Sequence, residues 1–337
     1  MPHERLTSVS TALRHLMRII VVAPLFLPSA FGGVCALRRK RMSLFLAAPR
    51  THLGAAKSTA CLRQTLGANQ WRIAIDSKVS MHPLFLLSGT GMMVVAIAAV
   101  WYWKKYSGVL WSFLLWGSLA WAIGVTLKAA ASIPTPAIIN QVRDALPPHF
   151  ADPVLWIYIG LLTGIFECGA TFAFAYIHRI REANWNEAVG FGVGFGAIEA
   201  LLVGVGYFLM VLVVIFIPDK LPPELLKFAT AGSDSLWVIP APIVERAIVI
   251  PLHALSCVLI IYAVRTRTWR WFWLSFAYKT VVDAIAGYIH LTYGLENLTT
   301  LDAWIVELVF LPFGVVGILG LYGFRRRWQL LSVEPTE

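Results

Sequence analysis

Several ionisable side chains lie within long apolar stretches of the sequence, and four of them are of types that could carry out hydrolysis. Glu167, Glu199, His253 and Asp283 each fall within such a stretch. Charged groups inside a membrane-spanning segment are unfavourable, and they generally face a protein interior or a water-filled cavity. A carboxylate and an imidazole held at one depth can activate water and polarise a carbonyl, with or without a metal. These residue types therefore point to hydrolysis inside a membrane.

The elements that must position these groups are transmembrane helices. An apolar run of about 20 residues crosses a bilayer core of about 30 Å, because a helix rises about 1.5 Å per residue. From residue 81 onward the sequence contains seven such runs, which predict an all-α, polytopic membrane helix bundle. The runs cover roughly 82–103, 108–131, 154–177, 188–217, 240–264, 269–292 and 302–324.

Basic and acidic residues alternate between the predicted loops. Every other loop is rich in Lys and Arg, whereas the loops between them carry mostly Asp and Glu. Because cytoplasmic loops carry an excess of Lys and Arg, this pattern places the N-terminus of the bundle outside and its C-terminus in the cytoplasm. The basic loops follow the first, third, fifth and seventh spans, at 104–105, 178–181, 265–270 and 325–327.

The positive charge of the chain belongs to its first quarter. The 337 residues carry a formal net charge of +10, and only 14% of them are charged, against about 25% in a soluble domain. All of the excess lies in residues 1–80. We interpret residues 1–80 as a basic leader, disordered or an over-called or processed start, and residues 81–337 as the seven-span domain. The charge-neutral body has no basic face, so we expect no nucleic-acid partner.

Depth along the spans predicts that the polar residues meet. Counted from the cytoplasmic end of each span, Glu167, Glu199, His253 and Lys279 lie 10 or 11 residues in, at about 15–16 Å, and Asp283 lies at about 21 Å. Residues that snorkel to the interface lie near helix ends instead. We therefore expect Glu167, Glu199, His253 and Asp283 to converge on one polar cavity near the midplane.

Spacing within the spans adds further expectations. Arg246 and His253 are seven residues apart and share a helix face to within about 20°. Lys279 and Asp283 have the i, i+4 spacing of an intrahelical ion pair, which would lower the cost of burying both charges. Lys279, by its depth, and Arg246, by the face that it shares with His253, join the candidate midplane residues.

Alternate glycines in the fourth span predict close helix packing. Gly192 and Gly196 form a GxxxG face that lets a neighbouring helix approach closely. That approach would bring Glu199, about one turn further on, near its partners. Helix packing alone also explains the glycines.

Four short segments, in this order, resemble the motifs of one family, the YhfC-type intramembrane proteases. These are broadly similar to CAAX-processing and bacteriocin-immunity membrane proteases, and the resemblance runs from about residue 81 to the end. The segments are Phe166–Thr171, Gly194–Ala200, Glu245–Arg246 with His253, and Lys279–Asp283.

The resemblance implies peptide-bond hydrolysis within the membrane, with a membrane peptide or protein as substrate. Glu167 would activate water, and His253 would be a metal ligand or polarise the carbonyl. Glu199 and Asp283 complete the implied catalytic set, and Glu167, Glu199 and His253 would hold a zinc ion. We expect an integral multi-pass protein in contact with the lipid bilayer of a bacterial inner membrane.

The sequence departs from the family pattern at four positions. Cys168, Thr171, Phe195 and Lys279 stand where the pattern has Glu, Arg, His and His. Lys279 would repel a cation, so a catalytically inactive homologue that binds membrane peptides or a protein partner is one alternative. A transporter whose midplane acids relay protons or bind a cation is another. The absence of a convincing internal repeat in the sequence disfavours the transporter.

Overall fold

The structure is a computed structural model that describes residues 81–294 and 299–331. Over these residues the chain is all helical, without a strand, which confirms the predicted all-α class. The interpretation of residues 1–80 as a leader falls outside the described residues.

Long helices form the body of the molecule, and short ones lie in the connections between them. The long ones are α4 (Leu86–Ser107), α5 (Trp111–Ala131), α7 (Pro148–Thr163), α10 (Trp185–Phe216), α12 (Ala241–Thr266), α13 (Arg270–Tyr293) and α14 (Thr300–Leu330). Helix α7 continues through η2 (Gly164–Cys168) into α8 (Gly169–Ala175). The short ones are η1 (Pro83–Phe85), α6 (Thr135–Ala145), α9 (His178–Arg181), η3 (Pro218–Lys220), α11 (Pro223–Ala229) and η4 (Leu236–Val238).

Within the described residues, six helical segments are long and apolar enough to cross a membrane, which indicates an integral membrane protein. They contain α4, α5, α7–α8, α10, α12 and α14. Helix α13 coincides with the sixth predicted span and has 24 residues, but it is less apolar, with Lys279 and Asp283 near its middle, and is not among the six. The count of seven spans and their orientation stay predictions.

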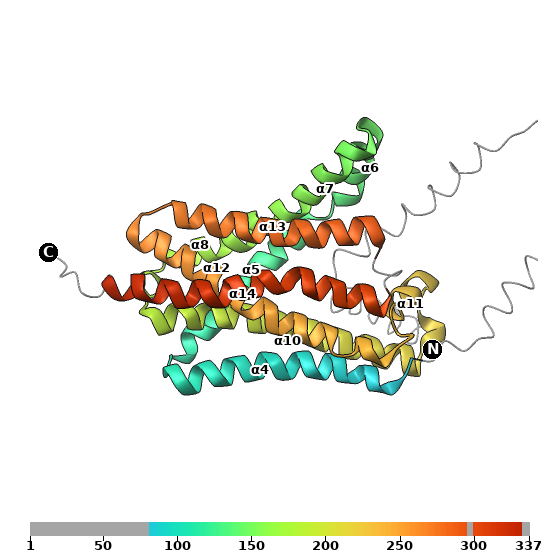
Figure 1. The fold of residues 1–337 in the computed structure, drawn as a ribbon, viewed down its shortest axis with the longest axis horizontal. Coiled ribbons are helices and arrows are strands. Elements are labelled where there is room, and N and C mark those ends of the chain that lie inside the picture. The colour runs from blue at the N-terminus through green and yellow to red at the C-terminus, as the bar shows by residue number, and fades with distance from the viewer. Residues whose placement is uncertain (1–80, 295–298, 332–337) are drawn as a thin grey trace, which may run out of the picture.

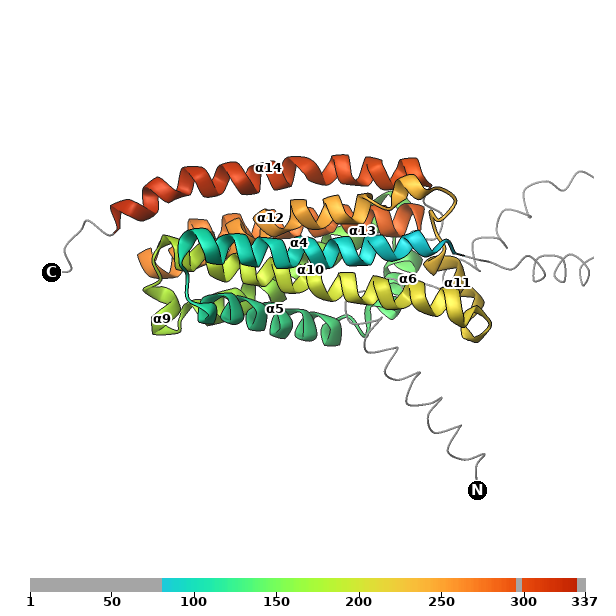
Figure 2. The same ribbon diagram turned by 90° about the horizontal axis from the view of Figure 1, so that it is seen from below.

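The basic connections lie together at one end of the bundle. The C-terminal ends of α4 and α14, helix α9 and the α12–α13 turn all lie at the left in Figures 1 and 2. Hydrogen bonds join these parts: Trp103 Nε1 donates to the Asn186 carbonyl at 3.0 Å, and Arg265 Nη1 donates to the Ala183 carbonyl at 2.8 Å. This placement agrees with loops that alternate between two sides of a membrane.

Helix α10 lies close to α12 along its glycine face. A β-carbon at Gly192 would lie 2.5 Å from Ala254 Cα, and one at Gly196 would lie 3.1 Å from Ile250 Cα. Real β-carbons essentially never come within 3.0 Å of another heavy atom, so the first contact requires glycine. The close approach predicted from the GxxxG pattern is confirmed, and it places Glu199 beside α12.

The opposite side of α10 packs as closely on α5. A β-carbon at Gly117 of α5 would lie 1.8 Å from the Phe191 carbonyl oxygen. We expect Gly117→Val to lower the free energy of unfolding by at least about 1–3 kcal/mol, because backbone must move to admit the side chain. Gly323→Val is the matched control, since nothing lies within 4 Å of a β-carbon there. Thermal unfolding in detergent measures both, and equal melting temperatures would contradict the contact.

Candidate functional site

Glu167 lies on a π-helical turn between α7 and α8. This turn, η2, is five residues long and widens the helix locally. Single π turns inside α-helices occur often at functional sites. Helix α5 packs directly against it, since a β-carbon at Gly124 would lie 3.0 Å from the Phe166 carbonyl oxygen. The turn directs the Glu167 carboxylate into the bundle, where the residue is only 3% exposed.

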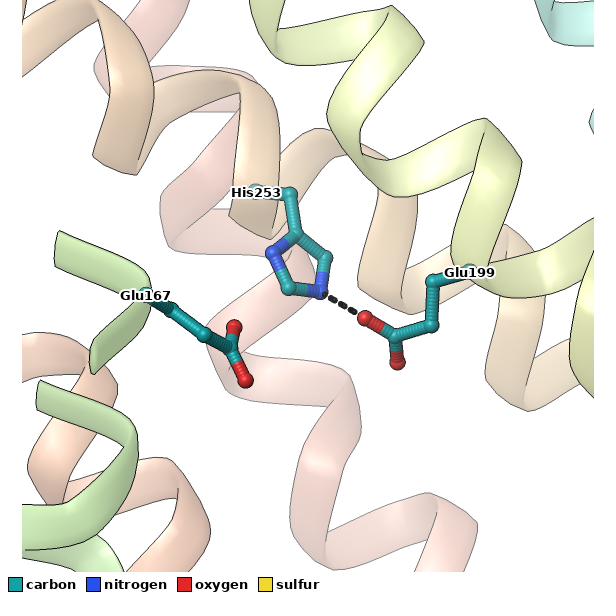
Figure 3. A group of neighbouring side chains, drawn as sticks. All are labelled: Glu167, Glu199 and His253. Atoms are coloured by element: carbon teal, nitrogen blue, oxygen red, sulfur yellow. Dashed lines mark ion pairs between the residues drawn. The ribbon is translucent and has the colours of Figure 1, made fainter. Parts of the chain in front are cut away.

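Glu199 and His253 approach Glu167 from two other helices, α10 and α12. His253 Nε2 lies 2.9 Å from Glu199 Oε2, the interaction dashed in Figure 3, and the Glu167 carboxylate points toward the same imidazole. The carboxylate oxygens and the imidazole nitrogen of the three residues all lie within 4.8 Å of one another. We call these three residues the Glu–Glu–His group. The structure thus brings together three of the four residues predicted to converge.

Lys279 of α13 lies between Glu167 and His253. Its Nζ donates to Glu167 Oε2 at 2.7 Å and lies 3.0 Å from His253 Nδ1. Because an ammonium has no lone pair, Nδ1 accepts this hydrogen bond, so the neutral ring carries its proton on Nε2 and donates it to Glu199. The sequence-based pairing of Lys279 with Asp283 is thereby corrected: the ion-pair partner of Lys279 is Glu167. Helix spacing shows which residues are neighbours on one helix, but not which groups face them from others.

Asp283 joins the site at its edge, through Lys128 of α5. Lys128 Nζ lies 2.5 Å from Glu167 Oε1 and 3.9 Å from Asp283 Oδ2. The Thr163 hydroxyl also donates to Asp283. Asp283 is therefore linked to the Glu–Glu–His group through Lys128. Lys128 was missed as a site residue in the sequence, because it lies near the end of its predicted span.

Arg246 binds the other carboxylate oxygen of Glu199, the one that His253 does not contact. Its Nη1 donates to Glu199 Oε1 at 2.8 Å, and its Nη2 donates to Glu245. Trp121 Nε1 adds a hydrogen bond to Glu199 Oε2 at 2.8 Å. Arg246 and His253 both contact Glu199, as expected for two residues that share a face of α12. Both oxygens of Glu199 are thus fixed in place.

Two of the residues that depart from the family pattern, Phe195 and Thr171, contact members of the group. The Phe195 ring lies 5.1 Å from the His253 ring between centroids, and Lys279 Nζ lies 5.8 Å from the Phe195 centroid. The Thr171 hydroxyl donates to the Glu167 carbonyl at 3.0 Å, within the helix. Phe195 therefore covers one side of His253 with an apolar surface.

The Glu–Glu–His group could bind a metal ion by the types and spacing of its ligand atoms. Carboxylate oxygen and imidazole nitrogen are ligands that zinc and other divalent metals take in proteins. Glu167 and His253 are buried and Glu199 is partly buried, and the three come from three separate helical segments.

Comparison with known proteins identifies the family. The model of the YhfC intramembrane metalloprotease family matches residues 91–309, a range that contains every site residue described above. No curated protein and no solved structure matches the chain. The family description suggests a metal and a lipid bilayer environment. With the match over most of the chain, the apolar helices and the buried Glu–Glu–His group, the chain belongs to the YhfC intramembrane metalloprotease family.

Proposed function

We propose that this protein hydrolyses peptide bonds of membrane peptides or proteins, with Glu167 accepting a proton from the attacking water. One observation carries the proposal: the buried Glu167 carboxylate lies within 4.8 Å of the ligand atoms of Glu199 and His253. A proton acceptor, a positive charge and an orienting imidazole are thus held together at one place. These are the groups that addition of water to a carbonyl requires.

Glu167 keeps lone pairs that can accept a hydrogen bond from water despite its two lysine partners. An ionised carboxylate has about four lone-pair positions. Lys128 takes one on Oε1, and Lys279 takes one on Oε2. Each oxygen therefore keeps a position at which it can accept a hydrogen bond from water.

Lys279 supplies the positive charge for the carbonyl oxygen in this proposal. An ammonium has three donors; two of them go to Glu167 and His253, and the third would serve the substrate. His253 is a positioning residue that acts through Lys279, and Glu199 fixes the His253 ring through Nε2.

Water then attacks the carbonyl carbon while Glu167 takes one of its protons. Lys279 stabilises the oxyanion of the tetrahedral intermediate by a hydrogen bond and by its charge. Glu167 returns the proton to the amide nitrogen as the C–N bond breaks. The products are a carboxylic acid and an amine, so the reaction consumes one water and needs no further reactant.

The metal suggested by the family does not fit this arrangement while Lys279 is in place. A metal ion held by the Glu–Glu–His group would need the lone pair of a His253 nitrogen. Lys279 occupies His253 Nδ1, and Nε2 carries the ring proton that it donates to Glu199. The steps above therefore use only side chains of this chain.

A library of membrane-spanning peptides, reconstituted with the purified full-length protein, tests the proposal. We expect the wild type to cleave members of the library and Glu167→Gln to leave them intact, because the amide cannot accept the proton. Glu307→Gln is the control: it removes another buried carboxyl, 7% exposed, on α14, and is expected to keep activity. Equal cleavage by the wild type and Glu167→Gln would overturn the proposal.

A second candidate is a non-catalytic family member that binds membrane peptides or a protein partner. Its supporting observation is that both oxygens of Glu167 and both nitrogens of His253 already have partners within the chain. The same library separates the two candidates, since a binding protein would retain intact peptide and release no fragments. The transporter alternative has no further observation in its favour.

A further inference from the structure

The strongest unassigned feature of the site is the position of the Lys279 ammonium. It contacts two of the three members of the Glu–Glu–His group, at 2.7 Å from Glu167 Oε2 and 3.0 Å from His253 Nδ1. The Lys279 side chain is only 5% exposed. A single cation thus bridges two of the three residues that could hold a metal ion. We infer that Lys279 takes the place of the metal ion, so that this protein binds no metal at the Glu–Glu–His group.

Neither nitrogen of His253 is available to a metal in this arrangement. If Nε2 were the ligand, the ring proton would move to Nδ1 and face the N–H groups of Lys279, where no atom could accept it. If Nδ1 were the ligand, the ion would need the position that Nζ occupies. Either arrangement requires Lys279 to leave.

An ion pair ties Lys279 to the Glu–Glu–His group. Its side chain is buried, and its ion-pair partner is Glu167. Moving the buried ammonium away from Glu167 takes it from its ion-pair partner and leaves the carboxylate with Lys128 alone. The ammonium is therefore a fixed part of the site.

The charges of the cluster lead to the same conclusion. With neutral His253, the ion-paired residues of the cluster carry one more negative than positive charge, and without Lys279 they would carry two more. A divalent ion would balance the cluster without Lys279. With Lys279 in place, the same ion would leave the cluster with an excess of positive charge. The set comprises Glu167, Glu199, Glu245, Asp283, Lys128, Lys279 and Arg246.

Zinc content of the purified full-length protein tests this inference, without use of any cleavage assay. The wild type is equilibrated with zinc chloride, desalted and analysed for metal, and so is Lys279→Ala. We expect far less than one zinc per chain in the wild type and about one per chain in Lys279→Ala, because a Glu–Glu–His set supplies three ligands. Zinc should also raise the melting temperature of Lys279→Ala and leave that of the wild type unchanged.

Lys128→Ala is the matched control. It also removes an ammonium from Glu167, but it leaves Lys279 on His253 Nδ1, so it is expected to stay free of zinc. If Lys279→Ala does not fold, Lys279→Met keeps the aliphatic packing and is measured in the same way. A stoichiometric zinc in the wild type that is lost in His253→Ala would overturn the inference. Folded Lys279 variants that bind no more zinc than the wild type would overturn it as well. Zinc content and melting temperature do not depend on peptide cleavage, so both still test the inference if the proposed hydrolysis is not observed.

Discussion

Replacing Arg246 by alanine is expected to lower the free energy of unfolding by about 3–5 kcal/mol. The Arg246 side chain is 8% exposed and pairs with Glu199 at 2.8 Å and with Glu245. The variant keeps the Glu199 carboxylate in place and removes its cation. Trp121 and neutral His253 still donate to Glu199, but neither carries the charge that offsets its burial. The cost is that of a buried charge left without its partner.

Arg143→Ala is the matched control for this prediction. Arg143 lies 3.5 Å from Asp152, and both side chains are about a third exposed. Exposed pairs of this kind contribute about 0–1 kcal/mol. Unfolding by a denaturing detergent, followed by the fluorescence of the 14 Trp residues, measures both variants. A loss for Arg246→Ala no greater than that for Arg143→Ala would contradict the buried pair.

The Glu–Glu–His group could be predicted from the sequence because a helix rises by a constant distance per residue. Residues at equal depth on neighbouring spans lie at equal height, and Glu167, Glu199 and His253 meet for this reason. The glycines at 192 and 196 added the close approach of α10 to α12. Periodicity and composition were sufficient for both conclusions.

Lys128 could not be found in this way, because counting residues assumes that spans run parallel to one another. Helix α5 crosses the bundle obliquely in Figure 1, so a residue near its C-terminal end comes to the height of Glu167. The long lysine side chain covers the remaining distance. Helix tilt depends on packing against neighbours, which a single sequence does not reveal.

The partner of Lys279 and the π turn at Glu167 were also beyond the sequence. Rotation of α13 about its axis decides whether Lys279 faces Glu167 across the bundle, whereas its i, i+4 spacing to Asp283 is the same in every orientation. The turn Gly164–Cys168 has no composition that distinguishes it from an ordinary helical turn. Helix α6 was likewise taken as part of a connection, and with the start of α7 it projects from the bundle in Figure 1.

Substitutions at Glu167 and Lys279 are expected to be strongly non-additive. Glu167→Leu leaves the ammonium groups of Lys128 and Lys279 without the carboxylate that binds both, at a cost of about 3–5 kcal/mol. Lys279→Met costs less, because Lys128 still compensates Glu167. The double variant removes the pair as a whole, so its cost should fall below the sum of the single costs by about 1–3 kcal/mol.

The two single variants and the double variant form a double-mutant cycle, and the same cycle at Arg181 and Glu182 is the control for an exposed pair. These groups lie 3.2 Å apart with both side chains well exposed, so their coupling should not exceed about 1 kcal/mol. Additive losses at Glu167 and Lys279 would show that the two charges are stabilised separately. Strong coupling would mean that the Glu167 charge depends on Lys279 as a metal-bound carboxylate depends on its ion. The cycle thus measures, through stability alone, whether a lysine is the cation of this site.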